Sequence, residues 1–567
     1  MIKLSKKEHI FFFFLAFVVF ALYFKSMSFD ILPNFDDGAY FADKSIQTLS
    51  SKNFLTYFSS YYLGMYQPIS VFSFALSEQL FDHSIIAQRV LSLLIHVFNC
   101  FLVFRLVSIF KQQLHGAHQF LPHFAMVLFA LHPMNVESVV WISARSTLLY
   151  SFFYLLALIY YFQTGKSTLK RHAIVLLFFT MALLCKVSAA TLPYMILALN
   201  LIFFKALKDK LFLAISISIS FVFIYIGVIA SSTFGHIQSV SDSYSIFERL
   251  CLISNALWLY LCKFLCPIYQ SAIYLYPSAE HGLRIEYYIS LVISIILILI
   301  YAKSLFSKSF LRKFKPELTG LTIFLSAIVI FLPLYWSRTV FITERYAYIP
   351  YIGLSVFFVS LLFRITQRIE RQISNLPAYL LIVVAIALGI STYVRIDVWK
   401  NPYTLFSDVV KNDRSTREVS MGLYNIGNEH LRNKNYIEAK KKYNLSIQLN
   451  DKYAEAYYNR GITNFFQKYH SEAIHDFTSA LHLGGNPAMI LINRAEAYRN
   501  LGKINEAYSD LCEAILSDNT GLALFSRGLL LYFSLNDQGS ACADWKVSAS
   551  LGNMDAKKFL ITYCNQN

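Results

Sequence analysis

Long apolar runs alternate with short polar segments over the first 395 residues of the chain. Most of these runs approach the roughly 20 residues that a membrane-crossing helix requires, although 120–131 and 172–185 are short for it. The runs lie near 10–24, 84–110, 120–131, 136–162, 172–185, 187–204, 211–231, 247–266, 285–302, 318–336, 346–363 and 376–394. This pattern predicts a polytopic bundle of membrane helices over residues 1–395.

The last third of the chain repeats itself at an interval of roughly 34 residues, the period of tetratricopeptide helix pairs. The repeated small residues are Gly427, Gly461, Ala495 and Gly528, each followed about a dozen residues later by Ala439, Ala473, Ala507 and Ala541. We expect a tetratricopeptide-repeat α-solenoid over 419–567, joined to the bundle by a polar connector at 396–418. The whole chain is therefore predicted to be all-α.

Composition supports the membrane assignment. The mean hydropathy is +0.48, and 56% of the 567 residues are hydrophobic against 15% charged, which is typical of membrane proteins. The net charge of +16 would also suit nucleic acid, but most of the excess lies in short loops between apolar runs. Such loops set membrane orientation, so no nucleic-acid partner is expected.

Basic clusters fix the predicted sides of the membrane, because loops rich in Lys and Arg stay in the cytoplasm. The clusters are Lys3, Lys6 and Lys7; Arg105 and Lys111; Lys166, Lys170 and Arg171; Lys205, Lys208 and Lys210; Lys303 to Lys315; and Arg364 to Arg371. The sides that these clusters assign are mutually consistent only if the run 247–266 does not cross the membrane. We therefore predict about eleven spans plus one re-entrant segment, in a bacterial inner membrane, with a cytoplasmic N-terminus and extracytoplasmic repeats.

None of the eight cysteines shows the paired spacing of a zinc site. The sequence allows a disulfide between Cys542 and Cys564 if the repeats lie outside the cytoplasm, where such bonds persist, but it does not decide whether the bond forms.

In this predicted topology, the unusual polar residues lie on the extracytoplasmic side of the membrane. The first outer loop, 28–83, begins with Asp36 and Asp37, which are followed by Gly38. Two adjacent carboxylates after a membrane helix suit a general base or a cation site. A helix cap with a turn explains the same residues equally simply.

A second outward group begins with His132. On a helix starting near Val136, Glu137, Trp141 and Arg145 would share one face, because they lie four residues apart. Charges that enter an apolar run usually face a cavity or a partner. The alternatives are a ligand site and a structural pair of Glu137 with Arg145.

Further outward residues are basic or aromatic. Lys186 lies between two apolar runs, where either anion binding or snorkelling to headgroups explains it. Arg338 and Arg345 offer the guanidinium fork that suits a phosphate. For Arg345, the alternative is a surface ion pair with Glu344, beside Tyr346 as an aromatic residue of the membrane interface.

At these residues the chain resembles the GT-C superfamily of polyprenyl-phosphate-sugar-dependent glycosyltransferases. Within it, the chain is most similar to the branch that combines membrane spans with tetratricopeptide repeats, whose eukaryotic members are O-mannosyltransferases. The segments that carry the resemblance are 131–143 (LHPMNVESVVWIS), 182–193 (ALLCKVSAATLP), 344–353 (ERYAYIPYIG) and 66–68 (YQP) with Ser73. The similarity covers nearly the whole chain.

The resemblance implies an inverting transfer of a sugar from a polyprenyl-phosphate donor to a protein hydroxyl or a glycan. The implied catalytic residues at the acceptor are Asp36 and Asp37. The implied donor-phosphate ligands are Lys186, Arg345, Arg145 and Arg338, and the implied lining residues are His132, Glu137, Glu344 and Tyr346. No metal ligands are assigned, although a divalent metal stays open.

Two departures from the family pattern leave the sugar and the acceptor open. Gln67 stands where relatives often have Arg, and 144–147 replaces a more charged string. The repeats are expected to recruit acceptor or partner proteins. The alternative functions are a catalytically inactive membrane scaffold for envelope assembly and a lipid or polysaccharide transporter.

Overall fold

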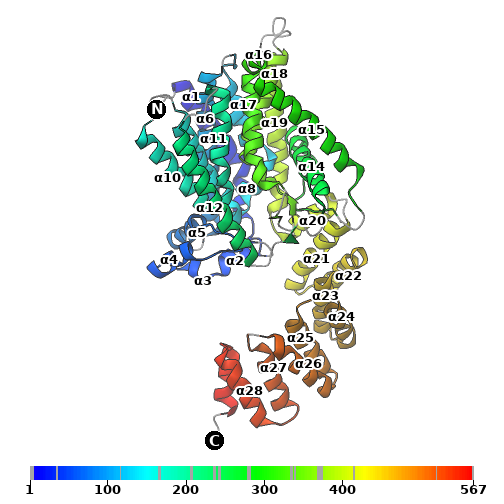
Figure 1. The fold of residues 1–567 in the computed structure, drawn as a ribbon. Coiled ribbons are helices and arrows are strands. Elements are labelled where there is room, and N and C mark those ends of the chain that lie inside the picture. The colour runs from blue at the N-terminus through cyan, green and yellow to red at the C-terminus, as the bar shows by residue number, and fades with distance from the viewer. Residues whose placement is uncertain are drawn as a thin grey trace. The chain divides into compact units, whose positions relative to one another are not determined.

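The structure is a computed structural model of the chain, and it is all-α apart from four short strands in the described residues. It describes residues 5–33, 36–82, 84–114, 116–163, 168–204, 209–233, 238–239, 244–277, 282–332, 336–337, 340–366, 375–412, 416–518 and 520–564. The chain forms two compact units, Met1–Leu405 and Phe406–Asn567 (Figure 1). This division falls inside the predicted connector 396–418.

Unit 1 is a bundle of long helices with a small helical subdomain between α1 and α6. The long helices are α1 (Lys6–Tyr23), α6 (Ile85–Gln113), α7 (Leu121–Leu131), α9 (Arg145–Phe162), α10 (Leu169–Cys185), α11 (Leu192–Phe204), α12 (Lys210–Thr233), α14 (Ile246–Leu265), α15 (Ile285–Phe306), α17 (Lys315–Ile328), α18 (Pro350–Thr366) and α19 (Leu376–Ile396). The shorter helices are α2 (Asp36–Ala42), α3 (Lys44–Gln47), α4 (Ser51–Ser59), α5 (Pro68–Phe81), α8 (Val136–Val140) and α16 (Lys308–Lys313).

Short 3-10 helices and strands connect these elements. The 3-10 helices are η1 (Phe24–Ser28), η2 (Pro133–Asn135), η3 (Ile142–Ala144), η4 (Val187–Thr191), η6 (Val329–Phe331), η7 (Glu344–Ala347) and η8 (Asp397–Trp399). Strand β1 (Gln238–Ser239) pairs antiparallel with β3 (Trp336–Ser337), and β2 (Tyr274–Leu275) with β4 (Val340–Ile342).

In the described residues, seven helices are long and apolar enough to cross a membrane, or eight if the bent pair 121–131 and 133–140 forms one span. The seven are Lys6–Ser28, Ile85–Gln113, Ile142–Phe162, Val187–Phe204, Lys210–Ser232, Ile285–Phe306 and Leu376–Trp399. The sequence predicts about eleven crossings, and the difference lies in shorter bundle helices. Helices α10, α17 and α18 have 14 to 17 residues, fewer than a full crossing requires.

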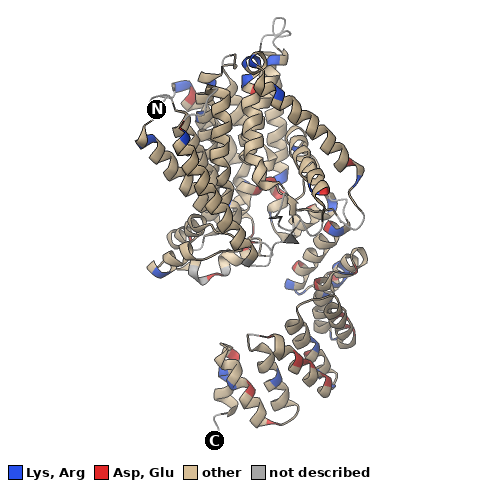
Figure 2. Cartoon of the chain, viewed as in Figure 1, with Lys and Arg blue, Asp and Glu red and all other residues tan. Residues whose placement is uncertain are grey.

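One end of unit 1 is basic. Figure 2 shows Lys and Arg gathered at the end where α16 lies, while charged residues are sparse along the helices. Contacts confirm that distant helix ends meet there: the Lys315 ammonium donates to the Gln113 carbonyl at 3.1 Å, and Arg364 pairs with Glu317. His172 lies 3.3 Å from Asp209 at the starts of α10 and α12. The loops that the sequence predicts to be cytoplasmic therefore share one end.

Helix α14 and the residues after it leave and return to the same place. The hydroxyl of Tyr244, just before α14, donates a hydrogen bond to the carbonyl of Pro277, which follows the helix and strand β2. A path that starts and ends together does not cross the bundle. This is the path that the sequence predicts for a re-entrant segment at 247–266.

Helices α17 and α18 cross with their backbones in close contact. A Cβ atom added at Gly320 would lie 2.5 Å from both the Gly353 carbonyl oxygen and the Phe357 nitrogen. Small residues at a helix crossing allow such contact, and here they bring η7, just before α18, against the bundle.

Unit 2 is a tetratricopeptide-repeat α-solenoid that follows α20 (Pro402–Asn412). Its helices are α21 (Thr416–Arg432), α22 (Tyr436–Leu449), α23 (Ala454–Phe466), α24 (His470–His482), α25 (Pro487–Asn500), α26 (Ile504–Ser517), α27 (Leu522–Phe533), α28 (Gln538–Ser550) and α29 (Met554–Phe559), with a π-turn at Leu560–Cys564. The predicted small residues stand where paired helices pack. A Cβ at Gly461 would lie 2.7 Å from the Phe477 ring.

A recurring ion pair also ties together the helices of the last three pairs. The pairs are Arg460 with Asp476, Arg494 with Asp510, and Arg527 with Asp544. Each arginine also reaches the preceding repeat; Arg494, for example, donates to the Thr478 hydroxyl at 3.0 Å. The arginines therefore link neighbouring repeats, as a solenoid built from nearest-neighbour contacts requires.

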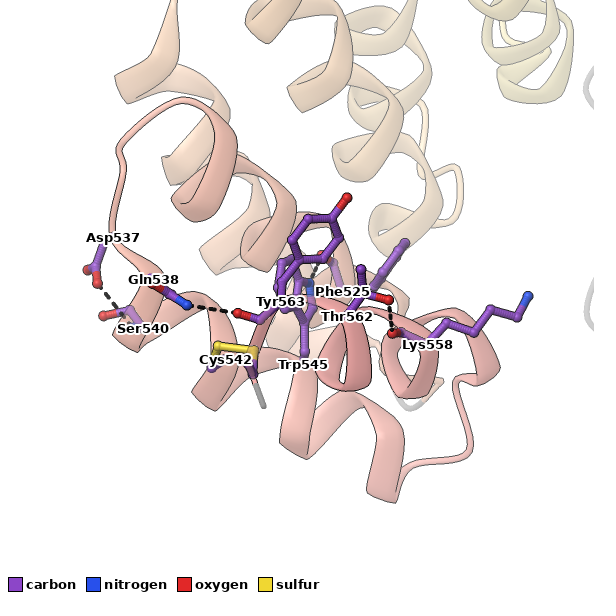
Figure 3. Close-up of a disulfide and its surroundings, with 10 residues drawn as sticks. Phe525, Asp537, Gln538, Ser540, Cys542, Trp545, Lys558, Thr562 and Tyr563 are labelled. Carbon is purple, nitrogen blue, oxygen red and sulfur yellow. Dashed lines mark hydrogen bonds between the residues drawn. A yellow bond between two sulfur atoms is a disulfide. The ribbon is translucent and has the colours of Figure 1, made fainter. Parts of the chain in front are cut away.

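A disulfide closes the C-terminal end of the solenoid. Cys542 of α28 is bonded to Cys564, with a Cα–Cα distance of 5.8 Å. Figure 3 shows Tyr563 beside Trp545 and the Gln538 amide pointing to the Tyr563 carbonyl, a hydrogen bond of 2.8 Å. The pairing that the sequence left open is present.

Candidate functional site

Residues far apart in the sequence line one cavity of about 200 Å³ in unit 1. Asp36 comes from the start of α2, Lys186 from the residue after α10, and Arg345 with Tyr346 from η7. Trp141 and Ser143 complete the wall at the break between α8 and α9. The cavity therefore brings one carboxylate and two cations together.

The two adjacent aspartates have different surroundings. Asp36 is half-buried and lines the cavity. Asp37 is 1% exposed and accepts hydrogen bonds from the backbone N–H groups of Leu32, at 3.1 Å, and Ser143, at 3.0 Å. The Ser143 hydroxyl donates to the same carboxyl group. Asp37 is thus a clamp that fixes the start of α2 against η3. It was predicted as a second catalytic carboxylate, and it does not line the cavity.

Burial raises the pKa of the Asp37 carboxyl. The hydrogen bonds from Ser143 and Leu32 and the charge of Arg89 act in the opposite direction. Burial prevails, so the pKa of Asp37 lies above that of an exposed aspartate.

Arg89 of α6 supports the same region. Its guanidinium donates to the carbonyls of Asp30 and Val140, at 2.7 and 2.6 Å. The segment before α2 and the end of α8 are therefore both hydrogen-bonded to the guanidinium of Arg89. Arg89 was not identified as a candidate from sequence, although a charge inside a long apolar run usually faces a cavity or a partner.

Arg345 is held by Glu137. Its backbone N–H donates to the Glu137 carboxylate at 2.8 Å, and its guanidinium pairs with the same carboxylate. The guanidinium carbon also lies 4.9 Å from the Trp141 ring centre and 5.5 Å from that of Tyr346. Burial opposes the charge, but the Glu137 carboxylate outweighs it and raises the pKa of Arg345. The cation is fixed in place and permanently charged.

Lys186 lies across the cavity wall in extended backbone between α10 and η4. Its ammonium donates to the Thr147 hydroxyl at 2.8 Å and lies 5.8 Å from the ring centres of both Tyr150 and Tyr346. Tyr346 therefore lies close to both cations of the cavity.

The structure corrects the predicted role and pairing of Arg145. The apolar run does not form one helix, because α8 ends at Val140 and Trp141 is extended. Glu137 consequently pairs with Arg345 and not with Arg145. Arg145 is fully buried, donates to Gln88 and to the Ser77 hydroxyl, and does not line the cavity. It supports α5 and α6 and is not placed to bind the donor phosphate.

Glu344 and His132 are structural in the same sense. Glu344 is fully buried and pairs with Arg395 of α19 at 3.0 Å, so the predicted surface pair with Arg345 is wrong. The fully buried His132 accepts from the Met134 N–H at 3.2 Å, so its other nitrogen donates to the Phe264 carbonyl at 3.2 Å. Neither lines the cavity. Arg338 lies outside the described residues.

Uncharged polar residues of the cavity were not identified as site residues from sequence. Ser146, Ser188 and Ser231 line it, and so does Gln67. The Gln67 amide nitrogen donates to the Tyr40 hydroxyl at 2.5 Å, while its carbonyl oxygen is buried without a hydrogen-bond partner among the described residues. Gln67 was identified from sequence only as a departure from the family pattern.

Among the described residues, no group of three or more His, Cys, Asp or Glu side chains is arranged to hold a metal ion. The arrangement in the cavity is suited instead to an anion beside the two cations, with one carboxylate available as a base.

No family model matches the chain, and no curated protein matches it. Similar solved structures include MamA, 20% identical over 27% of this chain and 89% of that one, with a TM-score of 0.25. YrrB, described as a TPR protein with an unusual peptide-binding site, is 17% identical over 28% and 85%, with a TM-score of 0.24. Yeast Tom70 is 12% identical over 82% and 94%, with a TM-score of 0.20. The repeat assignment of unit 2 rests on its own helix pairs.

Proposed function

We propose that the chain is an integral membrane glycosyltransferase, which moves a sugar from a polyprenyl-phosphate donor to an extracytoplasmic hydroxyl of a protein or glycan. The observation that carries this proposal is the cavity that Asp36 shares with Lys186 and Arg345. Sugar transfer from a lipid phosphate requires a base for the acceptor and cations for the leaving group. The cavity offers both.

In the proposed reaction the Asp36 carboxylate accepts the proton of the acceptor hydroxyl as the hydroxyl oxygen attacks the anomeric carbon. A new glycosidic C–O bond forms, and the bond between the anomeric carbon and the phosphate oxygen breaks with its electron pair. Lys186 and Arg345 stabilise the charge of the departing polyprenyl phosphate. Attack opposite the leaving group inverts the configuration, and Asp36 later releases its proton to solvent.

The volume of the cavity limits the size of the molecule that it can hold. At about 200 Å³ it is smaller than the roughly 300–1,000 Å³ of typical ligand sites. It therefore suits a sugar and its phosphate, while the polyprenyl chain remains outside. Phe223 and Ile330 in the wall are suited to the first isoprene units.

The proposal places the basic end of unit 1 in the cytoplasm of a bacterial inner membrane, with the N-terminus there and the cavity at the outer face. The positive-inside rule supports this orientation. Unit 2 then lies outside the cytoplasm, where its solenoid recruits an acceptor protein or another partner.

The test is transfer by the full chain reconstituted in vesicles, supplied with a panel of polyprenyl-phosphate sugars and with peptide and glycan acceptors. We expect at least one donor to yield glycosylated acceptor together with free polyprenyl phosphate. Movement of the donor across the bilayer without release of polyprenyl phosphate would identify a transporter. No reaction and no movement with any donor would favour the inactive scaffold.

A further inference from the structure

A second cavity lies on the outside of the helix bundle, between α1, α7 and α19. Its volume is about 860 Å³, and its walls are almost entirely apolar, with Phe11, Leu15 and Leu22 on α1 and Val127 on α7. From Lys7 to Leu22 the groove is roughly 22 Å long at ~1.5 Å per residue. It is longer than half of the ~30 Å hydrocarbon core of a bilayer.

Small residues of α19 form the hollow wall of the groove. Ala378, Ala385 and Gly389 lie seven and four residues apart, so they fall on one face of the helix. A Cβ atom added at Gly389 would meet nothing within 4 Å. The groove is therefore open space that the described residues do not fill.

Among the residues that line this apolar groove, the charged ones lie at one end. Lys7 and Glu8 line that end, and Arg105 lies close to Glu8. Lys111 lies close to His123, which also lines the groove. Lys7, Arg105 and Lys111 outnumber the single carboxylate of Glu8, which leaves that end of the groove positive.

We propose that this groove binds an anionic phospholipid, with its phosphate at the basic end and an acyl chain along α1 and α19. The groove is made by three helices of the apolar bundle, so its body faces hydrocarbon once the bundle is inserted, as the proposed function assumes. Basic pockets between membrane helices on the cytoplasmic side are suited to anionic headgroups. A second copy of this chain is a poorer occupant, because copies in one membrane bring their own basic ends together.

The experiment uses the full chain reconstituted in vesicles of equal phosphatidylglycerol and phosphatidylcholine, then re-extracted in mild detergent. Mass spectrometry measures both lipids per protein. Gly389→Phe fills the groove, and Val383→Phe is its control, because Val383 lies on the same helix, is 63% exposed and does not line the groove. A double variant, Lys7→Gln with Arg105→Gln, removes two of the three cations.

We expect the unsubstituted chain and Val383→Phe to retain several-fold more phosphatidylglycerol than phosphatidylcholine. Gly389→Phe should lose at least fivefold of the retained phosphatidylglycerol, and the double variant should retain the two lipids equally. Equal retention by the unsubstituted chain, or by Gly389→Phe and its control, would overturn the proposal. So would a dimer that Gly389→Phe alone converts to a monomer.

If Gly389→Phe does not accumulate, the double variant decides alone. Because the readout needs no sugar donor, lipid binding and the transferase proposal can fail separately.

Discussion

At the scale of single residues, the neighbouring aspartates of α2 divide two tasks. Asp36 lines the cavity, whereas Asp37 accepts hydrogen bonds from Leu32 and Ser143 and is 1% exposed. The clamp fixes the first turn of α2 and thereby the position of the Asp36 carboxylate. A substitution at Asp36 should therefore change the rate of the proposed transfer, whereas a substitution at Asp37 should change the stability of the fold.

Substitution Asp37→Asn should flatten the dependence of stability on pH. Because burial raises the pKa of Asp37, the folded state keeps a proton that the unfolded chain loses above about pH 4. The free energy of unfolding then falls as pH rises through the raised pKa. The apparent Tm of the detergent-solubilised protein, measured between about pH 4 and pH 8, should decline less in the variant. Parallel curves for both proteins would contradict this account.

Lys186 should act through its charge. Loss of the ammonium in Lys186→Gln should lower kcat/KM for the donor by roughly 10- to 100-fold, or about 1.4–2.8 kcal/mol. Lys186→Arg keeps the charge and should retain most activity. The control is Lys25→Gln, since Lys25 pairs with Asp397 away from the cavity. Equal losses in Lys186→Gln and Lys186→Arg would indicate a role that does not depend on charge.

At the scale of elements, the crossing of α17 and α18 depends on glycine. Gly320→Ala would place a Cβ 2.5 Å from backbone atoms of α18, which cannot move as a side chain can. Overpacking of this kind costs about 1–3 kcal/mol or more. The same substitution at Gly389 meets nothing within 4 Å and serves as the control. We expect a lower apparent Tm only for Gly320→Ala, and equal values would contradict the packing argument.

Helix positions could be predicted from sequence where the signal is local. A long apolar run predicts a helix without knowledge of its neighbours, and each of the twelve runs coincides with one or more helices. The breaks could not be predicted. Trp141 interrupts the run 136–162 with extended backbone, although no Gly or Pro marks the position.

Ion pairs were the least predictable part of the candidate site. One alternative for Glu137 was a pair with Arg145 on its own helix, but its partner Arg345 lies 208 residues away. Such partners depend on tertiary packing, which a single sequence does not encode at short range. The candidates Asp36, Lys186, Arg345 and Tyr346 nevertheless line one cavity. Their proximity agrees with the sequence prediction, in which the basic clusters assigned their loops to one side of the membrane.

At the scale of the whole molecule, the disulfide of unit 2 and the basic end of unit 1 make a joint prediction about compartments. Disulfides persist outside the cytoplasm. In intact cells, Cys542 and Cys564 should resist maleimide labelling until a reductant is added, with Cys512 as the unpaired internal control. Cys564→Ser should lower the stability of the solenoid by about 3 kcal/mol. Labelling of both cysteines without reductant would place the repeats in the cytoplasm, away from the proposed chemistry.

The most direct test of the proposed site is the rate at which polyprenyl phosphate is released in the reconstituted transfer reaction. Asp36→Asn removes the proposed base without changing the shape of the side chain. Its control is Asp82→Asn, an exposed carboxylate in the same subdomain. We predict that Asp82→Asn retains the full rate while Asp36→Asn loses at least 100-fold, with both proteins inserted and equally abundant. Equal rates for the two variants would contradict the assignment of this cavity as the site of sugar transfer.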